Sequence, residues 1–247
     1  PTTILSQIDS AIGGKVAVNH AKGKNLIGAF YPAQLIVADV DTLRSLSPRE
    51  LAAGWAEAIK CAMILDAPLL DLLSEHAAGL VDPDSVVFQS DLLVQIVDRC
   101  ARHKVSVVEE DEREAGLRMI LNYGHTIGQG LEAALNYNVL LHGEAVSIGM
   151  TAAAWLSVER GLLSWSDARR QRTVLEQFGL PTEFPRGQNN PTVDVVLDRI
   201  GHDKKAFNAR LRWVLLDRIG HAVIDSNVPP ELVRVAIENS LARELTA

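Results

Sequence analysis

Cysteine is scarce in this 247-residue chain, which contains only Cys61 and Cys100. Both lie in apolar-periodic segments typical of helices, so buried, reduced thiols are favoured over a disulfide framework. This indicates a reducing compartment, and we expect the cytoplasm. No apolar run approaches the roughly 18 residues that a membrane-spanning helix needs, and no basic-then-apolar leader opens the chain. We therefore expect no membrane association.

Basic residues are also too few for a nucleic-acid-binding surface. The 24 Lys and Arg residues are outnumbered by 31 Asp and Glu residues, which gives a net charge of -7. We therefore expect no nucleic-acid partner, although an acidic protein can still contain a local cationic pocket. A hydrophobic content of 47% is ordinary for a globular protein and is enough for a substantial core.

The chain lacks the self-contained motifs of two kinds of site. Neither GxGxxG nor GGG occurs, so a Rossmann-type phosphate loop is absent from these residues. Neither HExxH nor CxxC occurs, so any metal site must draw its ligands from separate segments. The first residues, without an initiator Met, read as a strand-to-loop transition inside a longer protein.

The periodicity is mainly helical after residue 46. Ser47, Pro48 and Glu50 combine an N-cap, an N1 proline and a capping-box glutamate, which predicts a helix to about Leu65. Loops are expected over residues 1–34, a strand over 35–40, and a hairpin that turns near 218–220. The expected fold is mainly α, a multi-helix domain with a few short strands. Further helical patterns cover residues 68–79, 85–107, 123–135, 143–161, 164–178, 192–200 and 230–245.

Two histidines in glycine-flanked settings, His125 and His142, are candidate metal ligands. A catalytic divalent cation typically takes three protein ligands and leaves one position open. Glu57 is the third candidate, because its alanine-rich helix would bury the carboxylate and burial requires a cation. The alternative is an ordinary ion pair of Glu57 with Lys60 or Lys104. Two imidazoles favour zinc over magnesium.

Basic residues near glycine or near these ligands suit an anionic substrate. Lysine binds phosphate as a point charge, and arginine grips carboxylate through its planar fork. For any single lysine a surface charge is the commoner explanation, but Lys15 and Lys24 favour ligand binding because the adjacent glycines let the backbone approach a ligand closely. Asp9 and Asn25 suit polyol hydroxyls, although turn chemistry explains both. The basic residues are Lys15, Lys24, Lys60, Lys104, Arg113, Arg118, Lys204 and Lys205.

Seven motifs together resemble 3-dehydroquinate synthase in order and approximate spacing, from residue 1 to about 205: IDSAIGGK, GKNLIGAFYP, GWAEAIK, ARHKVSVVEEDEREAGLR, NYGHTIG, LLHGEAVSIGM and HDKK. The resemblance implies an NAD- and zinc- or cobalt-dependent enzyme that converts 3-deoxy-D-arabino-heptulosonate 7-phosphate, a phosphorylated sugar acid, to 3-dehydroquinate and phosphate in the shikimate pathway. It also implies a possible homodimer. The expected division is a remnant of the nucleotide-binding domain with interdomain loops over 1–46, followed by a helical metal- and substrate-binding domain over 47–247.

The resemblance also assigns roles to residues. It implies the metal ligands Glu57, His125 and His142. It implies a catalytic group of Lys15, Lys60, Lys104, Glu114, Arg118, Asn122 and Gln129. The implied substrate-binding residues are Asp9, Lys15, Asn25, Lys60, Lys104, Arg118, Asn122 and one of Lys204 or Lys205, and the implied cofactor-binding residues are Thr2, Thr3, Asp9, Lys24, Thr42 and Ser45.

Two departures from the family pattern change what is expected. The family carries roughly a hundred further N-terminal residues with a Gly-rich phosphate loop, so we expect this chain alone to bind NAD poorly and to be inactive. The family reads GHTIGH where this chain has Gln129. Glutamine donates hydrogen bonds but exchanges no proton near neutral pH, and the loss of general acid–base assistance typically costs about 10²–10⁴-fold in rate.

Other functions are compatible with the same residues. Gln129 favours a sister sugar-phosphate cyclase that acts, for example, on sedoheptulose 7-phosphate. An NAD-dependent polyol dehydrogenase shares the two-domain plan but needs no phosphate-gripping lysines. The non-enzymatic alternative is a metal-binding or dimerising fragment.

Overall fold

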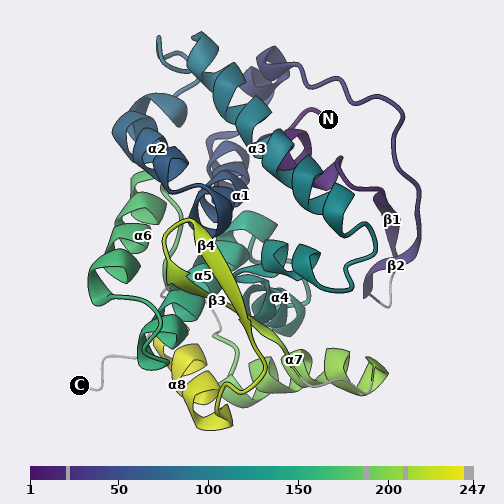
Figure 1. Cartoon of the computed structure of the whole chain (residues 1–247), viewed down its shortest axis with the longest axis vertical. Coiled ribbons are helices and arrows are strands. Elements are labelled where there is room, and N and C mark those ends of the chain that lie inside the picture. The colour runs from purple at the N-terminus through teal and green to yellow at the C-terminus, as the bar shows by residue number, and fades with distance from the viewer. Residues whose placement is uncertain (21–22, 186–189, 208–210, 242–247) are drawn as a thin grey trace.

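The computed structural model describes residues 1–20, 23–185, 190–207 and 211–241, with only the backbone for residues 19, 23–26 and 202–207. Helices dominate, as expected for the mainly α class (Figure 1). The α-helices are α1 (Pro48–Leu65), α2 (Ala67–Leu80), α3 (Asp91–Glu110), α4 (His125–Ala134), α5 (His142–Glu159), α6 (Trp165–Gln177), α7 (Val193–Phe207) and α8 (Pro230–Ser240).

Short elements complete the described chain. A π-helical turn spans Ser6–Ser10, and 3₁₀ turns span Val40–Ser45 and Leu117–Asn122. Strands β1 (Lys15–His20) and β2 (Gly23–Phe30) form one antiparallel hairpin, and β3 (Trp213–Arg218) and β4 (His221–Asp225) form a second, as predicted for the segment around 218–220. No helix among the described residues is both long enough and apolar enough to cross a membrane.

Side-chain caps set where the helices begin. Ser47 accepts a hydrogen bond from the Glu50 amide at 3.3 Å, which confirms the predicted start of α1. Ser90 caps α3 through the Leu92 amide, so α3 begins at Asp91 and the predicted start at residue 85 is wrong. Residues 85–90 form a turn in which the Ser85 hydroxyl accepts from the Phe88 amide.

Helix α5 lies at the centre of the fold between two apolar clusters. Val146 and Met150 face the cluster built largely by α1, α2 and α3, whereas Ala145 and Ile148 face the cluster built by α4, α7, α8 and β3. A helix that is apolar on nearly every face is typically buried. The central position of α5 brings its N-terminus against both α1 and α4.

Glycines allow this close packing of α5. A Cβ at Gly143 would lie 1.8 Å from the Ala53 carbonyl oxygen of α1, and a Cβ at Gly149 would lie 1.9 Å from the Gly124 carbonyl oxygen. Both distances are far inside van der Waals contact, so only glycine fits at either position. The start of α5, with His142, therefore lies directly on α1.

The N-terminal segment differs from the prediction. Residues 1–34 contain a π-helical turn and the β1–β2 hairpin where loops were expected. Residues 35–40 do not form the predicted strand, and Leu35 and Val37 are 80% and 68% exposed. A strand requires a neighbour to satisfy its backbone groups, and among the described residues no strand pairs with this segment.

Candidate metal and substrate site

Three helices each contribute one side chain to a common point. Glu57 lies in the middle of α1, whereas His125 and His142 are the first residues of α4 and α5. One donor atom from each residue lies within 4.8 Å of the other two. The structure therefore brings together the three ligand candidates that the sequence places 68 and 17 residues apart (125 − 57 and 142 − 125).

The Glu57 carboxylate is buried and faces both imidazoles. Its Oε1 lies 3.7 Å from His125 Nε2 and 3.5 Å from His142 Nε2, and the side chain is 1% exposed. Oε2 forms an ion pair with Lys60. The ion pair with Lys60 that the sequence analysis considered therefore involves Oε2. Oε1 faces the two imidazoles and remains the candidate metal ligand atom.

Each imidazole is oriented by a hydrogen bond at its other nitrogen. His125 Nδ1 donates to the Tyr123 carbonyl oxygen at 3.1 Å, and His142 Nδ1 donates to Glu132 Oε2 at 3.1 Å. Both Nε2 atoms are left facing Glu57. Histidine ligands of metals almost always donate their second N–H to a carbonyl or carboxylate in this way.

Burial and neighbouring charges shift the pKa values of His125, His142 and Glu57 in different directions. Burial lowers the pKa of His125 to about 4, with repulsion from Lys60 contributing. Burial also opposes the charge on His142, but the carboxylates of Glu132 and Glu57 outweigh it and raise the pKa to about 9. Burial would raise the pKa of Glu57, whereas Lys60 and the two imidazoles hold it well below its usual range.

These residues fit a divalent cation. Glu57 Oε1 is buried and has no hydrogen-bond partner among the described residues, although a buried charged oxygen is costly unless it is paired. Four ligands at about 2.0–2.1 Å in a tetrahedron lie about 3.3–3.4 Å from one another, close to the separations between Oε1 and the two Nε2 atoms. One carboxylate and two imidazoles suit zinc or cobalt better than magnesium.

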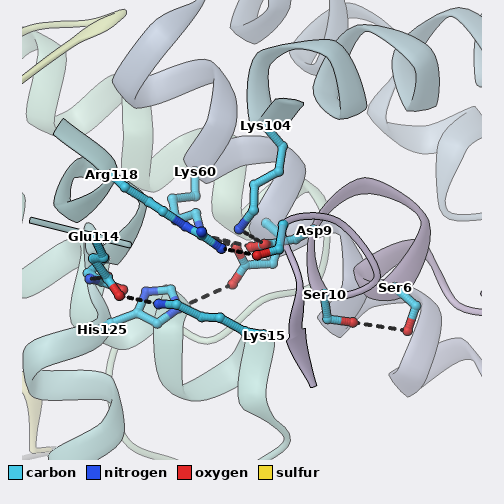
Figure 2. Close-up of polar contacts among 12 residues, drawn as sticks. Ser6, Asp9, Ser10, Lys15, Lys60, Lys104, Glu114, Arg118 and His125 are labelled. Atoms are coloured by element: carbon cyan, nitrogen blue, oxygen red, sulfur yellow. Dashed lines mark hydrogen bonds and ion pairs between the residues drawn. The ribbon is translucent and has the colours of Figure 1, made fainter. Parts of the chain in front are cut away.

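A cluster of charges adjoins this triad on the α1–α3 side. Lys60, which is 3% exposed, contacts Asp9 Oδ2 at 3.1 Å, and Lys104 of α3 pairs with Asp9 Oδ1. Figure 2 shows both lysines pointing toward Asp9. Burial alone would lower the pKa of Lys60, but Asp9 and Glu57 raise it above its usual value. Burial and repulsion from Lys60 lower the pKa of Lys104, against the pull of Asp9.

The segment after α3 contains three further residues that the sequence analysis assigned to the site, Glu114, Arg118 and Asn122. Glu114 pairs with Lys15 of β1 (Figure 2). It also accepts a hydrogen bond from Asn122 Nδ2 at 2.6 Å. Its φ of 60° lies in the left-handed region, which is strained for glutamate. Asp111 stabilises this turn by accepting from the backbone amides of three residues, Ala115, Gly116 and Arg118.

Arg118 is a buried cation without a carboxylate partner among the described residues. Its side chain donates only to the carbonyl oxygens of Glu112 at 2.5 Å and Gly13 at 2.9 Å, and the residue is 1% exposed. Carbonyl oxygens orient a guanidinium but do not neutralise it, so the site retains positive charge for an anion.

Two adjoining cavities connect these groups. The larger, of about 760 Å³, is lined by His125, His142 and Gln129, and also by Arg199 and Arg212. The smaller, of about 100 Å³, is lined mainly by the charged cluster of Asp9, Lys60, Lys104 and Arg118. Lys15, Glu114, Asn122 and His125 line both cavities.

Other predicted residues lie elsewhere. Thr2, Thr3, Thr42 and Ser45 line neither cavity; the hydroxyls of Thr3, Thr42 and Ser45 donate locally, to Ser6 Oγ and to the carbonyls of Asp39 and Thr42. No hydrogen bond or ion pair is described for Arg113, whose segment forms the turn beside Glu114. The side chains of Lys24, Asn25, Lys204 and Lys205 lie outside the described residues.

Sequence reasoning missed Glu132, Arg199 and Arg212. Glu132 is 2% exposed and orients His142; its signal was a glutamate among the apolar residues of the α4 segment, but no fixed spacing links it to His142. Arg199 and Arg212 stand beside apolar residues that anchor α7 and β3, and nothing local distinguishes them from surface arginines.

The fold and the donor set define a mainly helical domain that presents one carboxylate and two imidazoles beside a cation-rich cavity. Family models described as 3-dehydroquinate synthase N-terminal and 3-dehydroquinate synthase C-terminal match residues 1–53 and 54–206. The chain belongs to the 3-dehydroquinate synthase family.

Curated relatives carry the same name. The 3-dehydroquinate synthase of Thermosynechococcus vestitus is 48% identical over 237 residues, which is 95% of this chain and 62% of the relative. That of Desulforamulus reducens is 44% identical over 228 residues, 92% of this chain and 61% of the relative. The chain thus spans less than two thirds of the length of these relatives.

Solved structures of two cyclases share the fold. The 2-epi-5-epi-valiolone synthase of Streptomyces hygroscopicus subsp. jinggangensis, with NAD⁺ and Zn²⁺ bound, has a TM-score of 0.86 at 30% identity and covers 97% of this chain and 64% of its own. A 2-deoxy-scyllo-inosose synthase complexed with carbaglucose-6-phosphate, NAD⁺ and Co²⁺ has a TM-score of 0.83 at 28% identity and covers 98% of this chain and 66% of its own.

Proposed function

We propose that these residues form the metal- and substrate-binding part of a 3-dehydroquinate synthase. The proposed reaction converts 3-deoxy-D-arabino-heptulosonate 7-phosphate to 3-dehydroquinate and phosphate, with NAD and zinc or cobalt. The observation that carries the proposal is the convergence of Glu57 Oε1 with His125 and His142 Nε2 beside a cavity lined by cations. The shikimate pathway and a homodimer belong to this proposal through the family resemblance alone, and the cytoplasm belongs to it through the two buried, free cysteines.

The metal ion and NAD have defined roles in this proposal. Glu57, His125 and His142 would hold the metal, which when bound supplies Lewis-acid polarisation of a substrate oxygen, and NAD supplies a transient hydride acceptor. The oriented imidazoles and the buried carboxylate make the ligand set rigid before any ion binds, so little reorganisation is needed on binding.

The remaining residues bind and orient the substrate and hold protons. Lys60 and Lys104 form charge-assisted hydrogen bonds to Asp9, which fixes both ammonium groups at the rim of the small cavity. Arg118, held by two carbonyl oxygens, suits the carboxylate of a sugar acid. Burial alone would raise the pKa of Glu114, but Lys15 and Asn122 have the larger effect, and the net pKa lies below the usual value. The carboxylate is therefore ionised near neutral pH and can accept a proton.

Steady-state assays of the full-length protein that carries this chain test the proposal. With NAD and zinc we expect 3-dehydroquinate and one phosphate per heptulosonate 7-phosphate consumed. Turnover of sedoheptulose 7-phosphate alone would instead establish the sister-cyclase function, which Gln129 and the fold shared with the valiolone synthase favour. Net NADH formation from a polyol without phosphate release would establish a dehydrogenase.

A further inference from the structure

An ion pair that lines neither of the two cavities holds the start of α5 to α1. Arg49, in the first turn of α1, donates from Nε to Glu144 Oε1 and from Nη2 to Glu144 Oε2, each at 2.7 Å. The same Nη2 donates to the Val139 carbonyl oxygen at 2.9 Å. The guanidinium therefore contacts both the first turn of α5 and the loop that precedes it.

Glu144 also sets where α5 begins. Its Oε2 accepts a hydrogen bond from the Leu141 amide at 2.8 Å. Leu141, the residue before the helix, has no side-chain oxygen with which to cap it. The first amides of a helix have no partners within the helix, so the position of its first turn depends on contacts from outside the backbone ladder. His142, the first residue of α5, therefore depends on Glu144 for its position.

Arg49 shares one face of α1 with the candidate carboxylate ligand. Arg49, Ala53 and Glu57 are spaced four residues apart, and residues at this spacing are neighbours on the surface of a helix. One face of α1 therefore supplies a candidate metal ligand together with the contacts that place a second one. The residues that this face contacts are consecutive in the first turn of α5: Glu144, Gly143 and His142, in the same order.

From this arrangement we infer that Arg49 is a positioning residue for the metal site, acting through Glu144 to fix the separation of His142 from Glu57. A bidentate pair of arginine and carboxylate defines orientation as well as energy. The Glu144 side chain is 14% exposed, although that of Arg49 is 58% exposed. Glu132 orients the imidazole ring of His142, whereas the pair of Arg49 and Glu144 positions the backbone that carries this ring. The inference rests on the proposed function only through the metal site.

Competition with a chelator, which measures the zinc affinity of the full-length protein that carries this chain, tests the inference. The variants are R49Q, E144Q and R49Q/E144Q. The amide oxygen of E144Q can still accept from the Leu141 N–H, so this variant removes the ion pair and retains the cap. The matched control is R160Q. It removes the pair between Arg160 and Asp225 that joins the other end of α5 to β4, where the carboxylate is similarly buried, at 15% exposure.

We expect R49Q and E144Q each to weaken zinc binding about tenfold, the low end of the usual cost of losing an outer partner of a ligand. The double variant should lose no more than either single variant, because the two residues act as one unit. R160Q should bind zinc like wild type. With cobalt in place of zinc, the visible spectrum reports the coordination geometry, so it should change in R49Q and stay unchanged in R160Q.

Three results would overturn the positioning role. They are a wild-type zinc affinity in R49Q, an equal loss of affinity in R160Q, and additive losses in the double variant. Thermal unfolding of each variant sets the temperature of the titrations below its transition. A loss of affinity then reports the site and not the fraction of unfolded protein.

The same measurements separate this inference from the proposed function. Zinc binding that depends on Arg49, in a protein that forms no 3-dehydroquinate, would retain the positioning role and remove the synthase. Turnover of heptulosonate 7-phosphate together with an unchanged zinc affinity in R49Q would retain the synthase and remove the positioning role.

Discussion

At the scale of single residues, the hydrogen bonds made by the Nδ1 atoms of His125 and His142 determine how the two imidazole rings are oriented. Tyr123 O and Glu132 Oε2 each accept from an Nδ1 atom and leave Nε2 directed at Glu57. The sequence indicated the candidate ligands through residue type and helix context. It did not indicate Glu132, because a carboxylate on α4 reaches His142 only after the loop over residues 135–141 folds back.

We predict that Glu132→Gln weakens zinc binding about 10–100-fold, the usual cost of losing an outer partner of a histidine ligand. The amide still fills the buried space but carries no charge to orient and polarise His142. Competition with a chelator measures the zinc affinity. Glu176→Gln, on the exposed face of α6, is the matched control and should bind zinc like wild type; unchanged affinity in Glu132→Gln would exclude this orienting role.

At the scale of elements, one aspartate connects three helices. Asp66 lies between α1 and α2, caps α2 through the Leu69 amide at 3.1 Å, and accepts both arms of Arg99 of α3 at 2.6 Å. His103 Nε2 lies 2.7 Å from Asp66 Oδ2. Burial opposes ionisation of Asp66, but Arg99, His103 and the Leu69 amide outweigh it and hold its pKa below the ordinary 3.8.

We predict that Asp66→Asn lowers the free energy of unfolding at neutral pH by about 1–2 kcal/mol, because asparagine keeps the cap but loses the charge that Arg99 binds. Arg99 is 40% exposed, so solvent screening sets the low end of this range. Urea unfolding measures the difference. Asp98→Asn, which removes an exposed pair with Arg102, should change stability by less than about 0.5 kcal/mol.

The same substitution has a defined pH dependence. A carboxyl with a depressed pKa contributes stability that is complete above its unfolded value of 3.8 and is lost as the pH falls through its lower folded value. The difference between wild type and Asp66→Asn should therefore be constant near neutral pH and decrease as the pH falls from 3.8 through the lower folded pKa. A difference that grows as the pH falls would contradict this account of the contact.

At the scale of the whole molecule, the candidate metal ligands come from three helices that link the two apolar clusters: α1 packs in one cluster, α4 in the other, and α5 in both. An ion bound at that point would connect α1, α4 and α5, and an unfolded chain could not reproduce the arrangement. A ligand that binds only the folded state stabilises it by mass action, about 2.7 kcal/mol at a concentration of 100 times its dissociation constant.

We predict that such a zinc concentration raises the melting temperature of the chain by about 5–10 °C, because 1 kcal/mol corresponds to about 2–4 °C for a domain of this size. Scanning calorimetry with zinc and with a chelator measures the shift. Glu57→Gln should abolish most of it, whereas Glu50→Gln, an exposed residue on the same helix, should retain it. Equal shifts in both variants would remove Glu57 from the site.

The sequence by itself determined the helices after residue 46 and the chemical inventory of the site. Caps such as Ser47 and apolar periodicity act over a few residues, so most helices were predicted to within a few positions, and family motifs indicated the candidate ligands. Only the tertiary structure decided that Glu57 meets His125 and His142, and that Arg199 and Arg212 share their cavity. Those contacts join segments far apart in the chain, and they depend on packing such as Gly143 against Ala53, which no local pattern encodes. Residues 35–40 show the reverse case. Their β-branched pattern predicts a strand, but a strand requires a partner, and none of the described residues supplies one.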